Sequence, residues 1–414
     1  MSVDADVIVA GAGPAGATAA RVLAAAGLRT LIVERAAMPR NKPCGGGISA
    51  RVTSRFPYLR DALTCISVHW ISKLLLEGPS GGVFEMTSPR PAVLMIRRVE
   101  FDHRLVQLAL DAGAGLVAPA AVGQVEAHET GVTLTLRDGR RLTAPMVVAA
   151  DGVNSVIARR LGINPGWPAS RLALDMMEET PAALLRSTAP DTLHVFYGYG
   201  GAHGYAYVFP KREHVNVGIG YLLSYFRARV DAVPYDLQQH FVDDLKTRGV
   251  LAGDSQRDHF TPFLIPVGGP LRRTTAGRVL LAGDAGGFVN GFSAEGIYYA
   301  MVTGELAARA IVEARRGGTI DPAAAGRQYE RAWRREIGTE LRDSVILQRY
   351  LFHSPARMDG VVGGARAHPS LAQLLVDYAT GVQPYRTARR RLLMQSPRLA
   401  LRLTRLAWSR AASL

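Results

Sequence analysis

A glycine-rich turn near the start of the chain has the spacing that binds a nucleotide. The apolar stretch Asp6–Ala10 runs directly into Gly11, Gly13 and Gly16, which open the alanine-rich residues 15–26. In a strand–turn–helix unit, the first glycine permits the tight reversal, the second lets backbone amides approach a pyrophosphate, and the third lets the helix pack on the strand. Unpaired N–H groups and the helix dipole favour phosphate at the helix N-terminus. The pattern therefore predicts a dinucleotide site.

An acidic residue ends the second strand of this unit. We expect that strand at Arg29–Val33, and Glu34 follows it directly. A carboxylate at this point accepts hydrogen bonds from both ribose hydroxyls of an adenosine and would repel a 2′-phosphate, so FAD or NAD is favoured over NADP. A glycine-rich turn without a ligand is the alternative, but strand, turn, helix, second strand and acid all occur in the expected order.

A second glycine-rich segment surrounds one of the two cysteines. Lys42, Pro43 and Cys44 are followed by three consecutive glycines, Gly45–Gly47. Because glycine loses much conformational entropy on folding, such a run predicts a place where backbone passes close to a ligand or moves. A buried structural thiol is the alternative interpretation of Cys44.

Two later strands end in acidic residues. Met146–Ala150 precedes Asp151, and Val279–Ala282 precedes Gly283 and Asp284. The carboxyl ends of buried parallel strands face the ligand crevice of open α/β sheets. Since an apolar helical pattern follows from about residue 298, we expect the chain to return to the nucleotide domain there, so that segments distant in sequence build one site.

The middle of the chain, residues 167–275, is rich in alternating and aromatic residues. The strands expected here are Leu193–Tyr199, Tyr205–Phe209 and Val215–Gly220. They predict an antiparallel sheet with a turn at Pro210–Lys211. Tyr205 and Tyr207 are two residues apart on a strand and point to the same face, where they either pack in the core or line a substrate pocket.

These motifs together resemble a known family. The motifs are the glycine turn with Glu34, Arg98-x-x-Phe101-Asp102, Asp151-Gly152-x-Asn154-Ser155 and Gly283-Asp284-Ala285. The combination resembles FAD-containing oxidoreductases of the para-hydroxybenzoate hydroxylase fold. Within that superfamily, Lys42–Ser49, Tyr205–Lys211 with Asn216–Gly220, and Gly283–Asn290 with Glu295–Tyr298 resemble the geranylgeranyl reductase family.

The resemblance implies FAD as the cofactor. It implies that Arg98 reaches the flavin or its phosphates, that Asp284 binds the ribityl or pyrophosphate region, and that the amides of Gly296 and Ile297 face the flavin ring. The cofactor-binding residues expected in full are Gly11, Gly13, Pro14, Ala15, Gly16, Glu34, Arg35, Cys44, Gly45, Arg98, Val125, Asp151, Gly283, Asp284, Gly296 and Ile297.

The resemblance also implies an elongated apolar pocket for a polyprenyl chain. Its expected substrate-binding residues are Gly46, Gly47, Tyr205, Tyr207, Phe209 and Phe292, and its expected catalytic residues are Cys44, Tyr205 and Tyr207. The chain departs from the family at three positions, because the family often has Trp at Tyr207, Pro at Gly291 and Gly at Ala294.

The fold class expected is α/β with mixed α+β character: a Rossmann-like FAD-binding domain, an antiparallel-sheet substrate domain and a C-terminal helical tail. A length of 414 residues suits this organisation. The expected boundaries are 1–165 with 276–325 for the FAD domain, including an inserted loop and strand region at about 45–95, then 166–275 for the substrate domain and 326–414 for the tail.

The expected activity is FAD-dependent saturation of C=C bonds in an isoprenoid chain on a lipid, pigment or quinone precursor. Reduced flavin supplies a hydride, and Cys44, a tyrosine or ordered water supplies the proton. The alternatives are an FAD monooxygenase that hydroxylates an aromatic ring, a flavin halogenase with Lys73 in the relevant part of the chain, and a non-catalytic isoprenoid carrier. The electron donor expected is NAD(P)H or a reduced carrier.

Composition excludes several classes of site. Two cysteines, Cys44 and Cys65, form no disulfide framework, and ten histidines show no metal-ligand spacing, so no metal is expected. We expect no signal peptide and no transmembrane helix, and therefore a cytoplasmic protein.

The net charge of +14 is concentrated toward the C-terminus, where no acidic residue follows Asp377. Arg398, Arg402 and Arg405 form a stripe beside an apolar helix face with Trp408. This pattern suits peripheral contact with the inner face of the cytoplasmic membrane, and docking on the protein's own core is the alternative. Nucleic acid is not expected as a partner, and oligomeric state is left open.

Overall fold

The chain forms two compact units, each assembled from segments that are distant in sequence. The computed structural model describes residues 3–379 and 381–395. The first unit contains the residues up to Lys42, Arg98–Leu172 and Ile265–Leu341. The second contains Pro43–Arg97, Ala173–Leu264 and the residues from Arg342 onward.

The first unit is built on a six-stranded sheet in the order β20, β21, β12, β1, β2, β8. The strands are β1 (Val7–Ala10), β2 (Thr30–Val33), β8 (Gly115–Val117), β12 (Met146–Ala149), β20 (Thr275–Ala276) and β21 (Val279–Leu281). All neighbours pair in parallel except β20 and β21. The short apolar runs predicted as buried strands are confirmed, because every residue of β1, β12 and β21 is buried.

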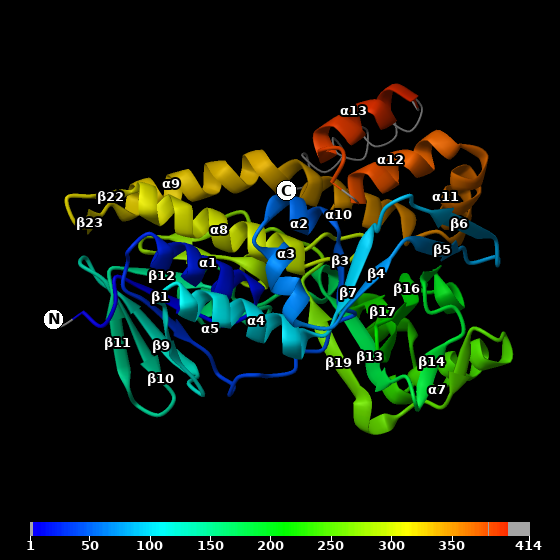
Figure 1. The fold of residues 1–414 in the computed structure, drawn as a ribbon, viewed down its shortest axis with the longest axis horizontal. Coiled ribbons are helices and arrows are strands. Elements are labelled where there is room, and N and C mark those ends of the chain that lie inside the picture. The colour runs from blue at the N-terminus through cyan, green and yellow to red at the C-terminus, as the bar shows by residue number, and fades with distance from the viewer. Residues whose placement is uncertain (1–2, 380, 396–414) are drawn as a thin grey trace. The chain divides into compact units, whose positions relative to one another are not determined.

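Three helices pack in this unit. They are α1 (Pro14–Ala25), α4 (Arg98–Asp111) and α8 (Ile297–Glu313), and α1 contacts both of the others (Figure 1). The contact between α1 and α8 brings backbone against backbone, since a Cβ at Gly304 would lie 2.1 Å from the carbonyl oxygen of Ala15. Only glycine permits this approach.

A small antiparallel sheet and several helices complete the first unit. The sheet contains β9 (Val122–Ala127), β10 (Val132–Leu136) and β11 (Arg141–Ala144), and α5 (Val156–Arg160) packs on β9. Alternating residues over 122–142, with a hairpin turn at Asp138–Gly139, predict an antiparallel meander, and the pairing of β10 with β9 and β11 confirms it. The sequence pattern of residues 329–348 predicts one amphipathic helix, but these residues are divided between α9 (Pro322–Trp333) and α10 (Thr339–Leu351) by a π-helical turn at Arg334–Gly338.

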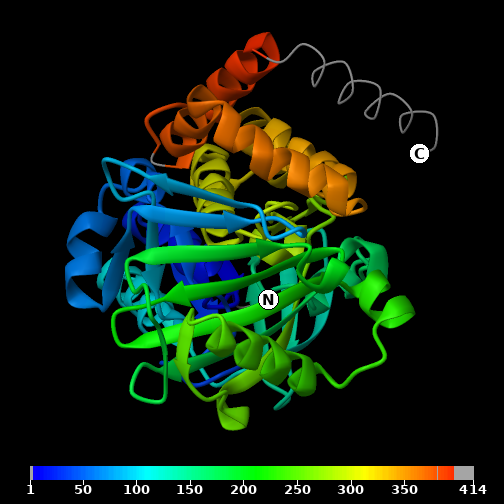
Figure 2. The same ribbon diagram turned by 90° about the vertical axis from the view of Figure 1, so that its right-hand side faces the viewer.

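The second unit is built on a seven-stranded sheet in the order β19, β13, β17, β16, β15, β5, β6 (Figure 2). The strands are β5 (Lys73–Glu77), β6 (Val83–Thr87), β13 (Ala173–Pro181), β15 (Thr192–Tyr197), β16 (Gly204–Pro210), β17 (His214–Leu222) and β19 (Phe260–Ile265). β13, β17, β16 and β15 form an antiparallel run, whereas β5 pairs in parallel with β15. Sequence patterns did not predict this parallel pair, because its strands are more than a hundred residues apart.

Two helices cover one face of this sheet. They are α6 (Leu223–Arg229) and α7 (Pro234–Thr247), neither of which was predicted. Phe241 and Leu245 of α7 are fully buried in one cluster with Val217 and Ile219 of β17. The other face of the sheet carries Tyr205 and Tyr207.

The remaining elements are short or lie near the C-terminus. A three-stranded sheet contains β3 (Gly47–Ser49), β7 (Val93–Ile96) and β4 (Val68–Ile71), and α11 (Pro355–Ala367) packs on β6. The others are α2 (Arg51–Arg55), α3 (Leu59–Ala62), β14 (Leu185–Ser187), β18 (Leu251–Gly253), β22 (Arg315–Arg316), β23 (Thr319–Ile320), α12 (Pro369–Ala379) and α13 (Tyr385–Gln395). The basic helix predicted at residues 396–414 lies outside the described residues. Among the described helices, none is long and apolar enough to cross a bilayer.

The backbone contact between α1 and α8 predicts that alanine at two helical glycines, Gly304 and Gly360, changes the stability of the protein very differently. Gly304→Ala should destabilise the protein by about 3 kcal/mol, since neither backbone can yield, as in an overpacked core. Gly360→Ala, on an exposed side of α11 with open space around it, should be neutral or stabilising by up to about 1 kcal/mol. Urea unfolding followed by circular dichroism measures both, and equal effects would contradict the argument.

Candidate active site

Of the three glycines in the glycine-rich turn of the first unit, only Gly13 has space for a side chain. A Cβ at Gly11 would lie 2.3 Å from the carbonyl oxygen of Ala150, and one at Gly16 would lie 1.8 Å from that of Gly11, so the chain's own backbone requires both glycines. A Cβ at Gly13 would meet only the Arg40 guanidinium, at 3.6 Å. Gly13 is the N-cap of α1 and makes no side-chain cap, so the N-terminus of α1 is left accessible to a bound phosphate.

A chain of buried ion pairs holds this turn. Glu34 Oε2 accepts a hydrogen bond from the Ala12 N–H at 2.7 Å, and Glu34 Oε1 lies 3.4 Å from Arg40 Nε. Arg40 also donates to Asp102 Oδ2 at 3.1 Å. Asp102 is fully buried and accepts two hydrogen bonds of 2.6 Å from Arg98. Each charge is therefore paired, as burial requires.

This network adds to the roles predicted for Glu34 and Arg98. Both side chains are almost fully buried and fix the turn and the start of α4. Arg98 uses a bidentate pair with Asp102, and the predicted contacts of Glu34 with ribose and of Arg98 with flavin stay predictions. Sequence analysis missed Arg40, whose guanidinium lies beside the open Gly13 position. Its only sequence signal was a basic residue shortly after Glu34.

Two later segments belong to the same unit. The N–H of Gly283, in the turn Gly283–Gly286, donates to Thr303 Oγ1 of α8 at 3.0 Å. Asp284 Oδ2 lies 3.9 Å from Lys42 Nζ, and a Cβ at Gly296 would lie 3.5 Å from Asp284 Oδ1. Gly296 is the N-cap of α8. The Asp284 carboxylate and the N-terminus of α8 are thus neighbours.

One departure from the family pattern has a visible backbone consequence. Ala294 has φ of 56°, the left-handed conformation that the glycine common in the family adopts without strain. The next residues, Glu295 and Gly296, lead directly into α8.

Asp151 is engaged within its own turn. Its carboxylate accepts a 2.6 Å hydrogen bond from Ser155 Oγ and one of 3.2 Å from the N–H of Ile157. Burial raises the pKa of Asp151, and these hydrogen bonds only partly oppose the shift. The carboxylate therefore caps the start of α5, and its predicted cofactor contact stays a prediction.

The other residues predicted to bind ligands are more dispersed. Arg35 is exposed, and Val125 is a half-buried residue of β9 that packs against the core of the first unit. Phe292 belongs to the first unit, whereas Gly46, Gly47, Tyr205, Tyr207 and Phe209 belong to the second.

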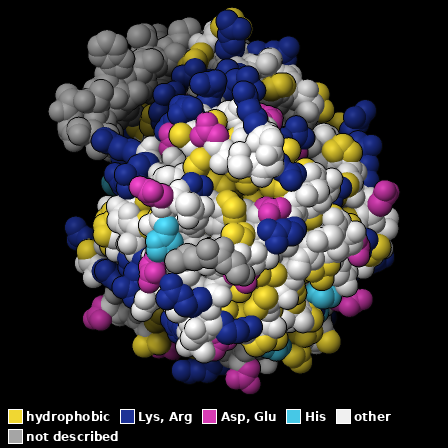
Figure 3. All heavy atoms as spheres, turned by 90° about the vertical axis from the view of Figure 1, so that its left-hand side faces the viewer, with side chains coloured by type: hydrophobic (Ala, Val, Ile, Leu, Met, Phe, Trp, Pro, Cys, Tyr) yellow, Lys and Arg dark blue, Asp and Glu magenta, His cyan; other side chains and the backbone are white. Residues whose placement is uncertain are grey.

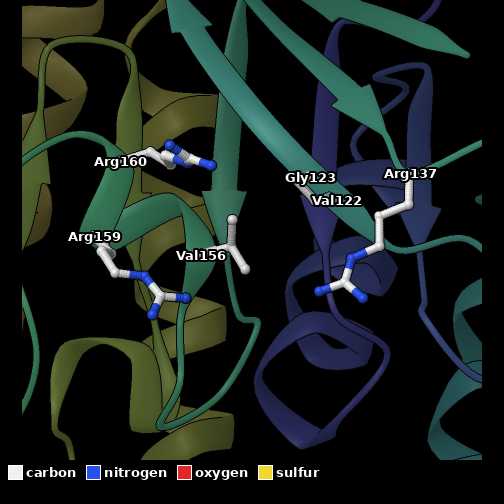
Figure 4. A pocket seen from close by; sticks show the side chains of 6 residues that line it. All are labelled: Val122, Gly123, Arg137, Val156, Arg159 and Arg160. Atoms are coloured by element: carbon white, nitrogen blue, oxygen red, sulfur yellow. The ribbon is translucent and has the colours of Figure 1, made fainter. Parts of the chain in front are cut away.

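A basic pocket lies beside the meander of the first unit. It has a volume of about 470 Å³ and is lined by Val122, Gly123, Arg137, Val156, Arg159 and Arg160. The three arginines are exposed, and Arg137 and Arg159 point toward the space between β9 and α5 (Figure 4). Their charge gives the pocket a positive potential. Lysine and arginine side chains are also widespread on the face in Figure 3, in agreement with the net charge of +14.

In the second unit, the Cys44 loop packs against strands β16 and β17. Cys44 Sγ accepts a 3.4 Å hydrogen bond from the Gly46 N–H, and the Cys44 carbonyl accepts one of 3.3 Å from Asn216 Nδ2. A Cβ at Gly45 would lie 3.0 Å from the Phe209 ring, and one at Gly46 would lie 2.2 Å from the carbonyl oxygen of Ile96. Close approach to the protein itself therefore accounts for these two glycines.

Three aromatic side chains form a continuous face beside this loop. The ring centroids of Tyr207 and Phe209 are 4.2 Å apart, and those of Tyr205 and Tyr207 are 6.1 Å apart. Burial raises the pKa of both tyrosines well above the usual value, and the nearby Asp175 and Cys44 raise it further. Both phenols therefore stay neutral through the physiological range. The prediction that they share a face is confirmed.

An ion triad of buried Lys211 with the partly buried Glu179 and Arg97 supports the same loop. Glu179 accepts hydrogen bonds from Lys211 Nζ at 2.5 Å and from Arg97 Nε at 2.6 Å. Lys211 lies under the loop, because a Cβ at Gly46 would be 2.8 Å from its Nζ. Burial raises the pKa of Glu179, but Lys211 and Arg97 outweigh it and lower the pKa overall.

The fold and the open glycine turn define an FAD-binding oxidoreductase. Residues 4–319 match the FAD binding domain family, and the chain belongs to it. It is 30% identical over 356 residues to digeranylgeranylglycerophospholipid reductase 2 of Methanothermobacter thermautotrophicus, which covers 84% of this chain and 87% of the relative. It is also 30% identical over 351 residues to the menaquinone reductase of Mycobacterium tuberculosis, covering 80% of this chain and 83% of that one.

A solved structure has the same fold. The geranylgeranyl bacteriochlorophyll reductase-like protein of Thermoplasma acidophilum aligns with a TM-score of 0.79 at 22% identity, covering 97% of this chain and 99% of that one. With the relatives above, it places the chain among the FAD-dependent reductases that the sequence motifs indicated.

The triad beneath the Cys44 loop predicts a pH-dependent stability. Glu179→Gln leaves Lys211 and Arg97 without their counter-charge and should cost about 3 kcal/mol at pH 7. Because the folded-state pKa of Glu179 lies below its usual value, its contribution is present above about pH 4.5 and is lost as the pH falls through the folded pKa. Urea unfolding at pH 7 and pH 4 measures the difference, which should shrink at pH 4.

Glu85→Gln, an exposed change in β6 of the same unit, is the control and should have little effect at either pH. A Glu179→Gln penalty that stayed constant between the two pH values would contradict the assignment.

Proposed function

We propose that this protein uses FAD to saturate C=C bonds in an isoprenoid chain of the geranylgeranyl type, carried by a lipid or a quinone. The observation that carries the proposal is the neutral aromatic face of Tyr205, Tyr207 and Phe209 beside Cys44. The names of the two 30% identical relatives, one a prenyl-lipid reductase and one a quinone reductase, support this substrate class.

The first unit fits the phosphates of FAD. The open position at Gly13 and the accessible N-terminus of α1 accept a pyrophosphate, and the guanidinium of Arg40 lies beside them. Arg40 is itself fixed by Glu34 and Asp102, so it presents its charge in one position. When bound and reduced, FAD supplies the hydride for the reaction.

The second unit fits a hydrocarbon substrate. The aromatic face continues into Leu193, Val195 and Tyr197 of β15, which belong to the same apolar cluster. Such a surface packs against the hydrocarbon of a prenyl chain and excludes water from an alkene.

We assign the proton to Cys44. The Tyr207 hydroxyl donates to Asp175, at 3.2 and 3.3 Å from its two oxygens, so its proton is already engaged. Cys44 lies at the same face, because the adjacent Gly45 packs against the Phe209 ring. A positioned acid typically contributes 10²- to 10⁴-fold to a rate.

The electron donor and any membrane contact are proposed from the sequence. NAD(P)H or a reduced carrier delivers electrons to the flavin, and the basic C-terminal segment contacts an anionic membrane from which a prenyl substrate is taken. Dithionite replaces the physiological donor in the experiments below.

Arg40→Met should weaken FAD binding by about 10- to 100-fold, the value of a charge-assisted contact. Titration of the apoprotein with FAD, followed by flavin fluorescence, measures the dissociation constant. Arg315→Met, an exposed change in β22, is the matched control and should bind normally. An unchanged affinity for Arg40→Met would remove Arg40 from the phosphate site.

Anaerobic turnover tests the reaction itself. Dithionite-reduced enzyme with geranylgeraniol should give products heavier by two hydrogens per double bond, detected by mass spectrometry. Cys44→Ser should lower kcat by about 100-fold, whereas Cys65→Ser, at the exposed cysteine, should retain full activity. A requirement for oxygen would instead indicate a monooxygenase, and full activity of Cys44→Ser would remove Cys44 from the proton step.

A further inference from the structure

A buried carboxylate lies on the same face of the seven-stranded sheet as the three aromatic side chains, and the mechanism above gives it no role. Asp175 on β13 is 6% exposed, and sequence analysis did not identify it. The Tyr207 hydroxyl on β16 reaches it across the intervening strand β17. The pairing register places Asp175 opposite Gly220 and Tyr207 opposite Gly218.

Glycines on the intervening strand make this contact possible. A Cβ at Gly218 would lie 2.5 Å from the Tyr207 hydroxyl oxygen and 2.6 Å from the ring carbon that bears it. Any side chain at this position would push the phenol away from Asp175. Because Gly218 has no side chain, the Tyr207 phenol reaches the Asp175 carboxylate across strand β17.

The titratable groups around Asp175 come from four elements. Tyr205 and Tyr207 face it from β16, and Tyr197 lies beside Tyr205 on β15. Cys44 faces the tyrosines from its loop. Glu179, Lys211 and Arg97 form their own triad four residues along β13, about 13 Å away at strand spacing. Among the described residues with a stated electrostatic effect on the two tyrosines, Asp175 has the largest.

The sign of this charge matters for the reaction proposed above. Saturation forms two C–H bonds: the alkene π pair bonds the proton, and the hydride pair bonds the other carbon, while the flavin is oxidised by two electrons. If the proton leads, the more substituted carbon becomes positive. If the hydride leads, negative charge develops, which needs an electron-withdrawing neighbour such as a carbonyl.

We propose, resting on the proposed function, that Asp175 is a positioning residue that makes the aromatic face selective for unconjugated, trisubstituted alkenes. Its carboxylate, fixed by Tyr207, favours the positive carbon that forms when the proton leads, and the π faces of Tyr205 and Tyr207 act in the same direction. The same charge opposes the negative charge that forms when a carbonyl-conjugated alkene accepts hydride. Asp175 therefore sets the class of double bond that reacts.

The test compares two substrates with one carbon chain. Geranylgeraniol has only unconjugated double bonds, and geranylgeranial conjugates its first double bond to an aldehyde. With dithionite-reduced, FAD-loaded full-length protein, Asp175→Asn should slow reduction of unconjugated bonds by about 100-fold. Reduction of the conjugated bond should change less than threefold or accelerate. Tyr207→Phe, which keeps the carboxylate, should slow geranylgeraniol reduction by less than 10-fold.

Two results would overturn the inference. One is equal slowing of both substrates by Asp175→Asn, as a structural role would give, and another is no change in either. Asp191→Asn, an exposed change at the start of β15, controls for charge at a distance. A wild-type enzyme that reduces neither substrate would instead overturn the proposed function.

A second measurement needs no variant of Asp175. Trifluoromethyl in place of the methyl group on the reacting double bond destabilises a positive carbon and stabilises a negative one. Wild-type enzyme should reduce this analogue at least 100-fold more slowly than geranylgeraniol. An equal or faster rate would overturn the inference even if Asp175→Asn does not fold.

Discussion

The first unit depends on backbone segments that approach one another with no side chain between them. Gly16 meets the carbonyl of Gly11, and Gly304 meets that of Ala15, so strand β1, helix α1 and helix α8 share one close-packed junction. Close packing of these backbones fixes the direction of α1. The accessible end of α1 and the N-terminus of α8 are positioned by the same junction. The positions of these two helix N-termini are thus a consequence of packing between glycines.

Each unit contains an ion pair made by one of two arginines that are adjacent in the sequence. Arg98 pairs with Asp102 in the first unit, and Arg97, the preceding residue, pairs with Glu179 in the second. Because an unpaired buried charge costs several kcal/mol, each pair holds its residue firmly within its own unit. The networks also fix two groups to which we assign a role, Arg40 beside the glycine turn and the Cys44 loop above Lys211.

Sequence patterns predicted the parts of the fold that local physics dictates. The β1–α1–β2 unit follows from apolar runs and fixed glycine spacing, and the meander follows from its Asp138–Gly139 turn. The pairing of β5 with β15 and the covering of the sheet by α6 and α7 were missed, because long-range pairing leaves no local pattern.

The residues of the candidate site also fall into those that sequence patterns predicted and those that they did not. The spacing of the glycines in the sequence identifies Gly11, Gly13 and Gly16. Arg40 and Asp175 are identified only by their contacts with residues that are distant in sequence. The glycines after Cys44 were interpreted as room for a ligand or for motion. At Gly45 and Gly46 the room is taken by Phe209 and by the carbonyl of Ile96.

Strand β17, which lies between Tyr207 and Asp175, connects a change of sequence in the sheet with the proposed substrate selectivity. Gly218 touches neither the phosphate turn nor the Cys44 loop in the contacts described, yet one methyl group there would separate phenol from carboxylate. A family member with alanine at this position would keep its flavin and its yellow colour, but its preference among alkene substrates would change. Divergence among such enzymes can therefore begin in the scaffold, behind the surface that meets the substrate.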